Sequence, residues 1–320
     1  MEQIKARTEQ IISEAAKIIV GKEEQLRLVV MAVFCGGHVL LDDLPGVGKT
    51  TFVKTISRVL GCSFSRVQFT PDLLPSDIIG MNVFNQKTGE FSMLHGPVMA
   101  NLLLADEINR AIPRTQSALL EAMEELQVTV DAKTYPLPLP FLVLATQNPV
   151  EMESTFPLPI AQMDRFLIRL SLGYPGHSEE IRMLQTVGDE IPFHSLRSLL
   201  GPEEIVAIQH EIRAVHVSEK VLAYIVSLVE ATRQSESIRL PVSPRGTRAL
   251  YRAGKALSAM DGRDFVTPDD IKRLAMHILP HRVTLSSEAR ISGKTPEGVI
   301  ADILATVAAP GDKGDILYGA

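Results

Sequence analysis

Short apolar runs alternate with amphipathic segments through the first half of the chain. Residues 39–41, 102–105 and 141–146 are apolar at almost every position, which is typical of strands buried on both faces of a parallel sheet. Residues 67–69 predict a further strand. Apolar residues at helical spacing predict helices over residues 4–20, 22–35, 52–60 and 114–125. The alternation predicts an α/β domain on a parallel sheet, which we place at residues 1–173.

Two polar segments interrupt this alternation of strands and helices. Residues 82–84 and 90–94 flank a five-residue loop and predict a β-hairpin, and residues 128–135 predict a second hairpin. A short helix is expected over residues 97–100.

The pattern changes after Tyr174-Pro175-Gly176. The rest of the chain has no obvious strand run, and we expect residues 174–320 to form an all-α lid domain with a frayed end from residue 310. Amphipathic helices are predicted over residues 178–186, 202–211, 218–234, 244–260, 268–279 and 296–308.

The segment from residue 39 to residue 51 reads Val-Leu-Leu-Asp-Asp-Leu-Pro-Gly-Val-Gly-Lys-Thr-Thr. A buried strand, a glycine-containing turn and a helix start are the context that a phosphate-binding loop requires. Lys49 would reach the β- and γ-phosphates, and the Thr50 hydroxyl would bind Mg²⁺. Asp43 stands where the usual motif has its first glycine, and we interpret it as a residue that tolerates unusual turn geometry. An ordinary glycine-rich turn is the alternative.

Polar side chains also follow the other two core strands. Asp106 and Glu107 come directly after residues 102–105, and Asn148 follows residues 141–146. At the carboxyl edge of a parallel sheet, Asp106 suits Mg²⁺ and Glu107 suits the polarisation of an attacking water. Asn148 would hold this water and the γ-phosphate. The alternatives are a structural ion pair for Glu107 and a turn-forming Asn before Pro149.

Composition narrows the class of protein. The chain has 320 residues, 45% hydrophobic and 22% charged, with a formal net charge of -6, so no basic surface for nucleic acid or anionic lipid is indicated. Cys35 and Cys62 are isolated, which predicts reduced thiols in a cytoplasmic protein. The longest uncharged stretch, residues 28–41, is shorter than the ~20 apolar residues that span a bilayer, and the charged start of the chain is unlike a signal peptide.

Several motifs together resemble the MoxR family of AAA+ ATPases. They run in the family's order from about residue 10 to residue 310 and include the following segments: Asp43-Leu44-Pro45-Gly46-Val47-Gly48-Lys49-Thr50, Leu104-Ala105-Asp106-Glu107-Ile108-Asn109-Arg110, Ser117-Ala118-Leu119-Leu120-Glu121-Ala122-Met123-Glu124-Glu125, Ala145-Thr146-Gln147-Asn148-Pro149, Ala161-Gln162-Met163-Asp164-Arg165-Phe166 and Ser243-Pro244-Arg245. The resemblance implies an AAA+ P-loop domain followed by a helical lid, acting in a ring that is usually a hexamer.

The resemblance also implies roles for single residues. Asn148 would be the sensor-1 residue, Arg165 the arginine finger and Arg245 the sensor-2 arginine, while residues 70–96 would be the helix-2 insert. Val20 and Gly21 fall where such proteins close over adenine. The residues expected to bind ATP are thus Val20, Gly21, Leu44, Pro45, Gly46, Val47, Gly48, Lys49, Thr50, Thr51, Asp106, Asn148 and Arg245.

The chemistry of the two arginines agrees with these roles. Arg165 has a planar, permanently charged group that suits a phosphoryl transition state, although a plain salt bridge with Asp164 is the alternative. Arg245 follows Ser243 as N-cap and Pro244 as first helical residue, so it lies on the opening turn of a helix.

The sequence therefore predicts a cytoplasmic Mg²⁺-dependent ATPase whose hydrolysis drives conformational work on another protein. The resemblance suggests chaperone-like maturation of protein complexes, often beside a partner with a von Willebrand factor A domain. A metal-chelatase motor subunit and a nucleotide-gated scaffold with little turnover are the alternatives. We disfavour a nucleic-acid remodeller, because the predicted hairpins carry mixed charges rather than basic ones.

Overall fold

The computed structural model describes residues 1–43, 46–87, 89–147, 155–186 and 191–311 of the chain. It divides into two compact units. The sheet unit comprises Arg7–Leu158 and Leu170–Ile208, and the helical unit comprises Met1–Ala6, Pro159–Arg169 and Gln209–Ala320. These units do not coincide with the predicted domains 1–173 and 174–320, and that domain boundary stays a prediction.

The main sheet has the strand order β2–β5–β8–β1–β9. Its strands are β1 (His38–Asp42), β2 (Phe64–Gln68), β5 (Leu102–Asp106), β8 (Leu142–Gln147) and β9 (Phe166–Leu170). The pairs β2–β5, β5–β8 and β8–β1 are parallel. The apolar runs of β1, β5 and β8 are buried at nearly every position, as the sequence predicted; β9 was not predicted.

The strand register sets which residues meet at the carboxyl edge of the sheet. Gln68 pairs with Asp106, and Asp42 pairs with Gln147. Because parallel strands end at the same edge, the residues that follow β1 and β5 are brought to one side of the sheet unit.

Four of the described α-helices in the first half correspond to predicted ones, whereas those at Pro75–Ile79 and Ile160–Met163 were not predicted. The described helices of this half are α1 (Glu2–Ala15), α2 (Glu23–Cys35), α3 (Lys49–Val59), α4 (Pro75–Ile79), α5 (Pro113–Glu125) and α6 (Ile160–Met163). On α3 the apolar residues Phe52, Val53 and Ile56 are buried, as their spacing predicted. The prediction of a helix over residues 97–100 was wrong: this segment forms a turn, because Val98 N donates to the carbonyl oxygen of Ile78 and not to one within its own segment.

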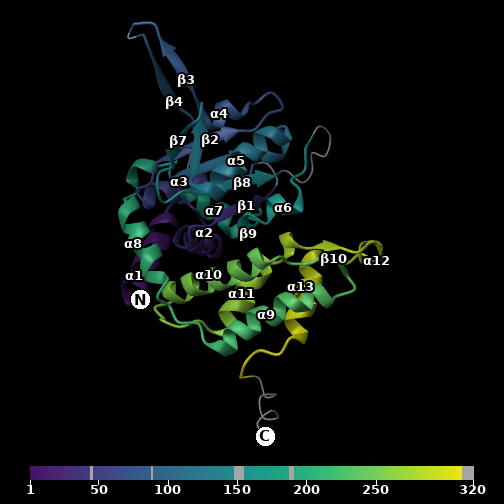
Figure 1. Cartoon of the computed structure of the whole chain (residues 1–320). Helices are drawn as coiled ribbons and strands as arrows, with labels where there is room; N and C mark the ends of the chain where they lie inside the picture. The colour runs from purple at the N-terminus through teal and green to yellow at the C-terminus, as the bar shows by residue number, and fades with distance from the viewer. Residues whose placement is uncertain (44–45, 88, 148–154, 187–190, 312–320) are drawn as a thin grey trace. The chain divides into compact units, whose positions relative to one another are not determined.

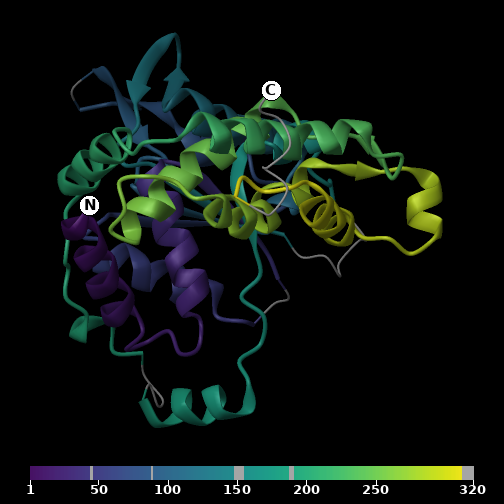
Figure 2. The ribbon, with the colours of Figure 1, turned by 90° about the horizontal axis from the view of Figure 1, so that it is seen from below.

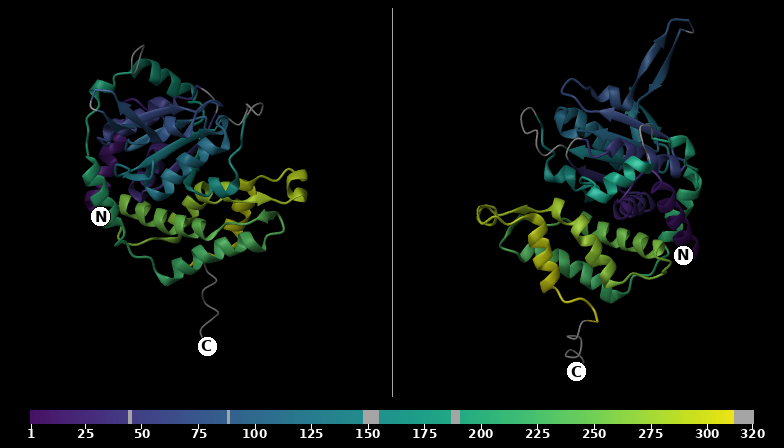
Figure 3. Two further views of the ribbon diagram at one scale, coloured as in Figure 1. Left: turned by 45° about the horizontal axis from the view of Figure 1, so that its top comes forward. Right: turned by 180° about the vertical axis from the view of Figure 1, so that it is seen from behind.

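Both predicted hairpins are present. The strands β3 (Gly80–Asn85) and β4 (Glu90–His95) pair along their whole length and extend away from the rest of the sheet unit (Figures 1 and 3). The strands β6 (Gln127–Val130) and β7 (Lys133–Pro136) turn at Asp131 and Ala132, which both have positive φ. Asn82 donates a hydrogen bond to Asp131, so the two hairpins contact each other.

Helices dominate the rest of the chain. They are α7 (His177–Thr186), α8 (Pro202–Ile212), α9 (Glu219–Gln234), α10 (Pro244–Met260), α11 (Pro268–Ile278), α12 (Ser287–Ile291) and α13 (Pro296–Thr306). In Figure 2, α7 is the teal helix that follows the extended segment after β9. The helix α10 packs against α9 and α11 and supplies much of the core of the helical unit.

The expectation of an all-α lid needs one correction. The short strands β10 (Ile238–Leu240) and β11 (Thr284–Leu285) pair antiparallel in the helical unit. Strands of this length carry too few residues for a period-2 pattern to be recognised, so they were not predicted.

Candidate nucleotide-binding site

The loop between β1 and α3 has the backbone of a phosphate-binding loop. Gly46 and Gly48 have φ values of 85° and 84°, in the left-handed region that favours glycine. Gly48 is the N-cap of α3, so the unpaired N–H groups of the first helical turn and the positive end of the helix dipole lie at the loop. Leu44 and Pro45 lie outside the described residues.

Asp43 is accommodated for a different reason from the one we expected. It is not among the described residues with positive φ, so its tolerance of unusual turn geometry is not used. Its carboxylate instead accepts hydrogen bonds from Ser171 Oγ at 2.6 Å, Leu172 N at 2.7 Å and Gly173 N at 3.0 Å. The Asp43 carbonyl oxygen accepts a bond from Lys49 Nζ at 2.9 Å.

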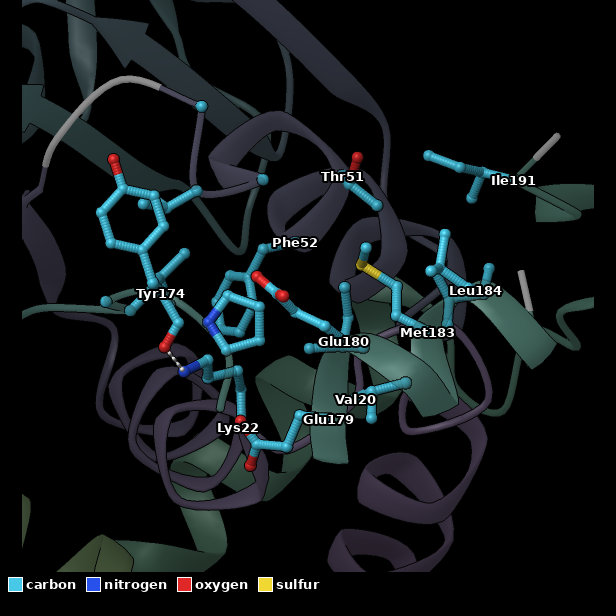
Figure 4. A pocket seen from close by; sticks show the side chains of 18 residues that line it. Val20, Lys22, Thr51, Phe52, Tyr174, Glu179, Glu180, Met183, Leu184 and Ile191 are labelled. Carbon is cyan, nitrogen blue, oxygen red and sulfur yellow. Dashed lines mark hydrogen bonds between the residues drawn. The ribbon is translucent and has the colours of Figure 1, made fainter. Parts of the chain in front are cut away.

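A cavity of ≈ 490 Å³ lies beside this loop (Figure 4). Apolar residues before α2, the loop, the start of α3, and residues of α7 and the segment before it form its wall; they include Ile18, Ile19, Val20, Gly46, Val47, Gly48, Thr51, Phe52, Tyr174, Met183 and Leu184. An apolar cavity next to an anion-binding loop matches a ligand with a flat base at one end and phosphates at the other. The structure thus brings Val20 together with the loop.

Gly21 does not line this cavity, although its neighbours Val20 and Lys22 do. Its φ is 72°, and a Cβ built on it would lie 2.0 Å from Glu179 Oε1 on α7. A side chain at this position would therefore require the Glu179 side chain to move and would strain the backbone, because this φ favours glycine. Beside it, Lys22 Nζ donates a hydrogen bond to the carbonyl oxygen of Tyr174 at 3.2 Å, so the turn after α1 is joined to the segment before α7.

Asp106 lies at the end of β5 and is almost buried, with 9% of its surface exposed. Its Oδ1 accepts a bond from Thr146 Oγ1 at 2.7 Å, and its Oδ2 accepts one from Arg66 Nη2 at 2.7 Å. Arg66 is on β2, the neighbouring strand, and is half exposed. The carboxylate is thus held in place by both neighbouring strands.

Glu107 follows with a φ of 55°, a backbone conformation that residues other than glycine rarely adopt. Its N–H donates to Thr146 Oγ1 at 2.8 Å, while its Oε2 accepts bonds from Gln68 Nε2 at 2.8 Å and Arg110 Nη1 at 3.2 Å. Residues with such strained backbone, kept in place by surrounding hydrogen bonds, occur more often at functional sites than elsewhere. Glu107 also forms an ion pair with Arg110, so a structural role for Glu107, the alternative to catalysis, is consistent with this geometry.

Sequence reasoning missed Thr146, Arg66 and Gln68. Thr146 is fully buried and contacts both acidic residues. A hydroxyl at the end of an otherwise apolar strand was the available signal, but threonine is also a common strand residue. Arg66 and Gln68 alternate along β2, and only the pairing of β2 with β5 places them beside Asp106 and Glu107.

The residues predicted to bind Mg²⁺ fit this ion by their chemistry. The Thr50 hydroxyl and the Asp106 carboxylate are hard oxygen ligands, which Mg²⁺ prefers. Across the described ranges, no group of three or more His, Cys, Asp or Glu side chains is placed to hold a metal. Mg²⁺ needs no such cage, since it keeps several waters and binds one or two protein oxygens together with substrate phosphates.

Arg165 and Arg245 belong to the helical unit, where one hydrogen-bonded cluster joins their neighbours. Ser243 is the N-cap of α10, as predicted: its Oγ accepts from Arg245 N at 3.1 Å and donates to Asp164 Oδ2 at 2.6 Å. Arg282 Nε donates to Asp164 Oδ1 at 2.8 Å. The segments that carry the two arginines are therefore held by the same carboxylate.

Arg282 is a further residue that the sequence did not indicate. Its side chain is 2% exposed, and burial lowers its pKa to about 10, an effect that the neighbouring Asp164 opposes. Burial and the adjacent Arg282 also hold the pKa of His281 well below its usual range, so this imidazole is neutral. Asn148, the predicted sensor-1 residue, lies outside the described residues.

Three comparisons with known proteins agree with this geometry. Residues 38–168 match the family model "ATPase family associated with various cellular activities (AAA)", and residues 230–303 match the AAA lid domain. In the part of the chain that is described, no helix is long and apolar enough to cross a membrane.

Relatives cover nearly the whole chain. The uncharacterized protein YeaC of Bacillus subtilis is 47% identical over 92% of both chains, and the chaperone MoxR1 of Mycobacterium tuberculosis is 41% identical over 94% of this chain and 82% of its own. The crystal structure of a putative ATPase from Cytophaga hutchinsonii superposes with a TM-score of 0.90 at 39% identity and covers 96% of both chains. The chain therefore belongs to the MoxR family of AAA+ ATPases.

Proposed function

We propose that this protein hydrolyses ATP with Mg²⁺ and uses the energy to remodel partner protein complexes. The observation that carries the proposal is the cavity beside the phosphate-binding loop, which Val20, Gly46 and Gly48 line together. Lys49 and the first turn of α3 complete a site for a nucleoside triphosphate at the sheet edge where Asp106 and Glu107 lie.

Each predicted residue takes a separate role in this proposal. Lys49 would bind the β- and γ-phosphates, Thr50 and Asp106 would hold the magnesium ion, and Glu107 would orient the attacking water and accept its proton. The ion would neutralise charge on the phosphates. Asn148 would contact the γ-phosphate, Arg165 would stabilise the transition state in a neighbouring subunit, and Arg245 would report loss of the γ-phosphate to the lid.

Two variants test this assignment by steady-state phosphate release and equilibrium ATP binding. Glu107→Gln keeps the size of the side chain but removes the base, so ATP should still bind while turnover falls by about 10²–10⁴-fold. Lys49→Ala should weaken binding itself, because the phosphate charge loses its partner. Normal turnover in the first variant, or unchanged affinity in the second, would contradict the roles given to these residues.

The role in partner remodelling rests on similarity. The relative from Mycobacterium tuberculosis is named a chaperone. We propose a ring, usually a hexamer, that acts on a protein client or on a partner with a von Willebrand factor A domain, without nucleic acid and in the cytoplasm. A metal-chelatase motor subunit would share the site and differ in its partner, so co-purification with a trapped ATP state separates the two.

One contact favours a second candidate, a nucleotide-gated scaffold with little turnover. The Glu107 carboxylate is already engaged by Gln68 and Arg110. Both bonds end on Oε2 and hold the carboxylate in place, so in this second candidate Glu107 stabilises the sheet edge and does not act on water. The phosphate-release assay decides: turnover above the level of Glu107→Gln supports the ATPase, and turnover equal to that level supports the scaffold.

A further inference from the structure

Asp43 stands where the usual motif has a glycine, and the backbone conformation of Asp43 does not account for an aspartate at this position. Its side chain is buried, with 4% of the residue exposed, and lies against residues more than a hundred positions away. There it accepts hydrogen bonds from Ser171, Leu172 and Gly173. A buried carboxylate is stable only when such donors replace the water it has lost.

We call residues 171–174 the strap. Leu172, Gly173 and Tyr174 line the cavity beside the phosphate-binding loop, and the strap leads directly into α7. Asp43 holds one end of it. The other end is held at the Tyr174 carbonyl oxygen by Lys22, which lines the cavity together with Val20 (Figure 4).

Asp43 also contacts the phosphate side of the site. Its carbonyl oxygen accepts a hydrogen bond from Lys49 Nζ at 2.9 Å. A single residue thus connects the lysine that would bind phosphates with the strap that forms a wall of the cavity for the base.

We propose that Asp43 is a positioning residue that fixes the spacing between the phosphate subsite and the base subsite, so that a nucleoside triphosphate engages both at once. This inference rests on the proposed function. Two weak subsites held at the correct separation bind a linked ligand far more tightly than either fragment, because the second contact becomes intramolecular. Loss of the fixed separation removes this gain and leaves each subsite intact.

Asp43→Asn is the substitution that tests this role most directly. It keeps the shape of Asp43, but an amide has one acceptor oxygen, while the structure points donors at both carboxylate oxygens. At least one bond is therefore lost, and the amide N–H₂ faces another donor. Each unsatisfied buried donor is destabilising, so the strap should separate from the loop.

The inference is tested by comparing two probes, ATP and inorganic tripolyphosphate, by isothermal titration calorimetry with Mg²⁺. Tripolyphosphate occupies the phosphate subsite alone, whereas ATP needs both subsites. In Asp43→Asn we expect ATP to bind roughly 10- to 100-fold more weakly. Tripolyphosphate should bind as well as before or slightly better, because the substitution removes a negative charge beside the phosphates.

Two further variants serve as controls. Asp131→Asn changes a carboxylate to an amide at a hairpin turn in the same unit, where the asparagine oxygen can still accept the bond from Asn82; both affinities should stay unchanged. Ser171→Ala removes one donor to Asp43 and should lower ATP affinity by a smaller factor without affecting tripolyphosphate. It also keeps the test available if Asp43→Asn does not fold.

The outcomes separate this inference from the proposed function. If the wild-type protein binds neither probe, the nucleotide site itself is wrong. If the wild type binds both, an equal loss for ATP and tripolyphosphate would show that Asp43 only shapes the loop, and no loss for either would show that it has no role in binding. Each of these two results overturns the inference and leaves the proposed function standing.

Discussion

Single side chains decide the detail of the candidate site. Thr146 bonds to both acidic residues at the sheet edge, and Asp43 bonds to both sides of the cavity. The roles of these two residues cannot be recognised from their residue types, because a threonine in a strand and an aspartate in a turn are both common. Their contribution comes from what the fold places within hydrogen-bonding distance.

Glu14 is another side chain of this kind. It is buried on α1 and accepts bonds from Lys17 Nζ, Arg197 N and Arg197 Nη2. Burial by itself raises the pKa of this carboxyl, but the hydrogen bonds outweigh it and lower the pKa to about 2. The folded state thus favours the ionised form more strongly than the unfolded state does.

This shift gives a prediction for Glu14→Gln. A lowered pKa contributes stability that is fully present above the unfolded value of 4.5 and is lost as the pH falls towards 2. The variant should therefore unfold at lower urea concentration than the wild type at pH 7, and the difference should shrink between pH 4.5 and pH 2. Midpoints from circular dichroism at several pH values measure this. A difference that stays constant with pH would contradict the lowered pKa.

At the scale of elements, the predicted helix ends agree best with the structure where the sequence contains a capping residue or a proline. The helix α10 begins at Pro244 and ends at Met260, as predicted, because Ser243 caps it and proline favours the first helical position. The helix α11 starts at Pro268 with a capping box between Thr267 and Asp270. By contrast, α1 ends at Ala15 instead of continuing to residue 20, although Ile18 and Ile19 are buried. Their burial in the loop extended the apolar pattern beyond the helix.

The start of α11 also carries a stability prediction. The Asp270 carboxylate accepts bonds from Ser258, Arg263 and Thr267. Asp270→Ala removes the acceptor of Ser258 and Thr267 and leaves Arg263 with Asp261 as its remaining ion-pair partner, so it should lower the free energy of unfolding by about 2 kcal/mol. Asp269→Ala, at an exposed position of the same turn, should cost less than about 1 kcal/mol. Urea unfolding measures both, and equal losses would show that the cluster adds nothing beyond the helix dipole.

At the scale of the whole molecule, the proposal that Arg165 acts in a neighbouring subunit gives a prediction. Arg165 belongs to the helical unit and the phosphate-binding loop to the sheet unit. If Arg165 serves a neighbouring nucleotide, Arg165→Ala should bind ATP normally and hydrolyse little of it. Glu107→Gln should be equally inactive, but its defect lies on the subunit that holds the nucleotide.

Mixing these two variants is the corresponding test. A subunit with intact Glu107 can receive Arg165 from a neighbour, so phosphate release should return in proportion to the number of such interfaces. Light scattering confirms that mixed rings form. If they form and no activity returns at any ratio, hydrolysis is not shared in this way. Arg165 would then serve the structure of its own unit, beside the carboxylate of Asp164 that Arg282 and Ser243 hold.

The sequence by itself determined the features that depend on near neighbours in the chain. These are the buried strands, the caps of α10 and α11, the phosphate-binding loop from Gly46 to Thr50 and the acidic residues that end β5. Local backbone preferences and apolar periodicity act over a few residues, so they can be read from a single chain.

Only the tertiary structure decided which distant residues complete the site. It placed Arg66 and Gln68 beside Asp106 and Glu107, because β2 pairs with β5. It also placed the carboxylate of Asp43 against residues 171–173 and that of Asp164 against Arg282. These contacts depend on strand order and on the path of the chain between elements. The pattern of residue types along the chain predicts neither the strand order nor this path. Any residue with a hydrogen-bond donor can bind the carboxylate if the fold places it nearby.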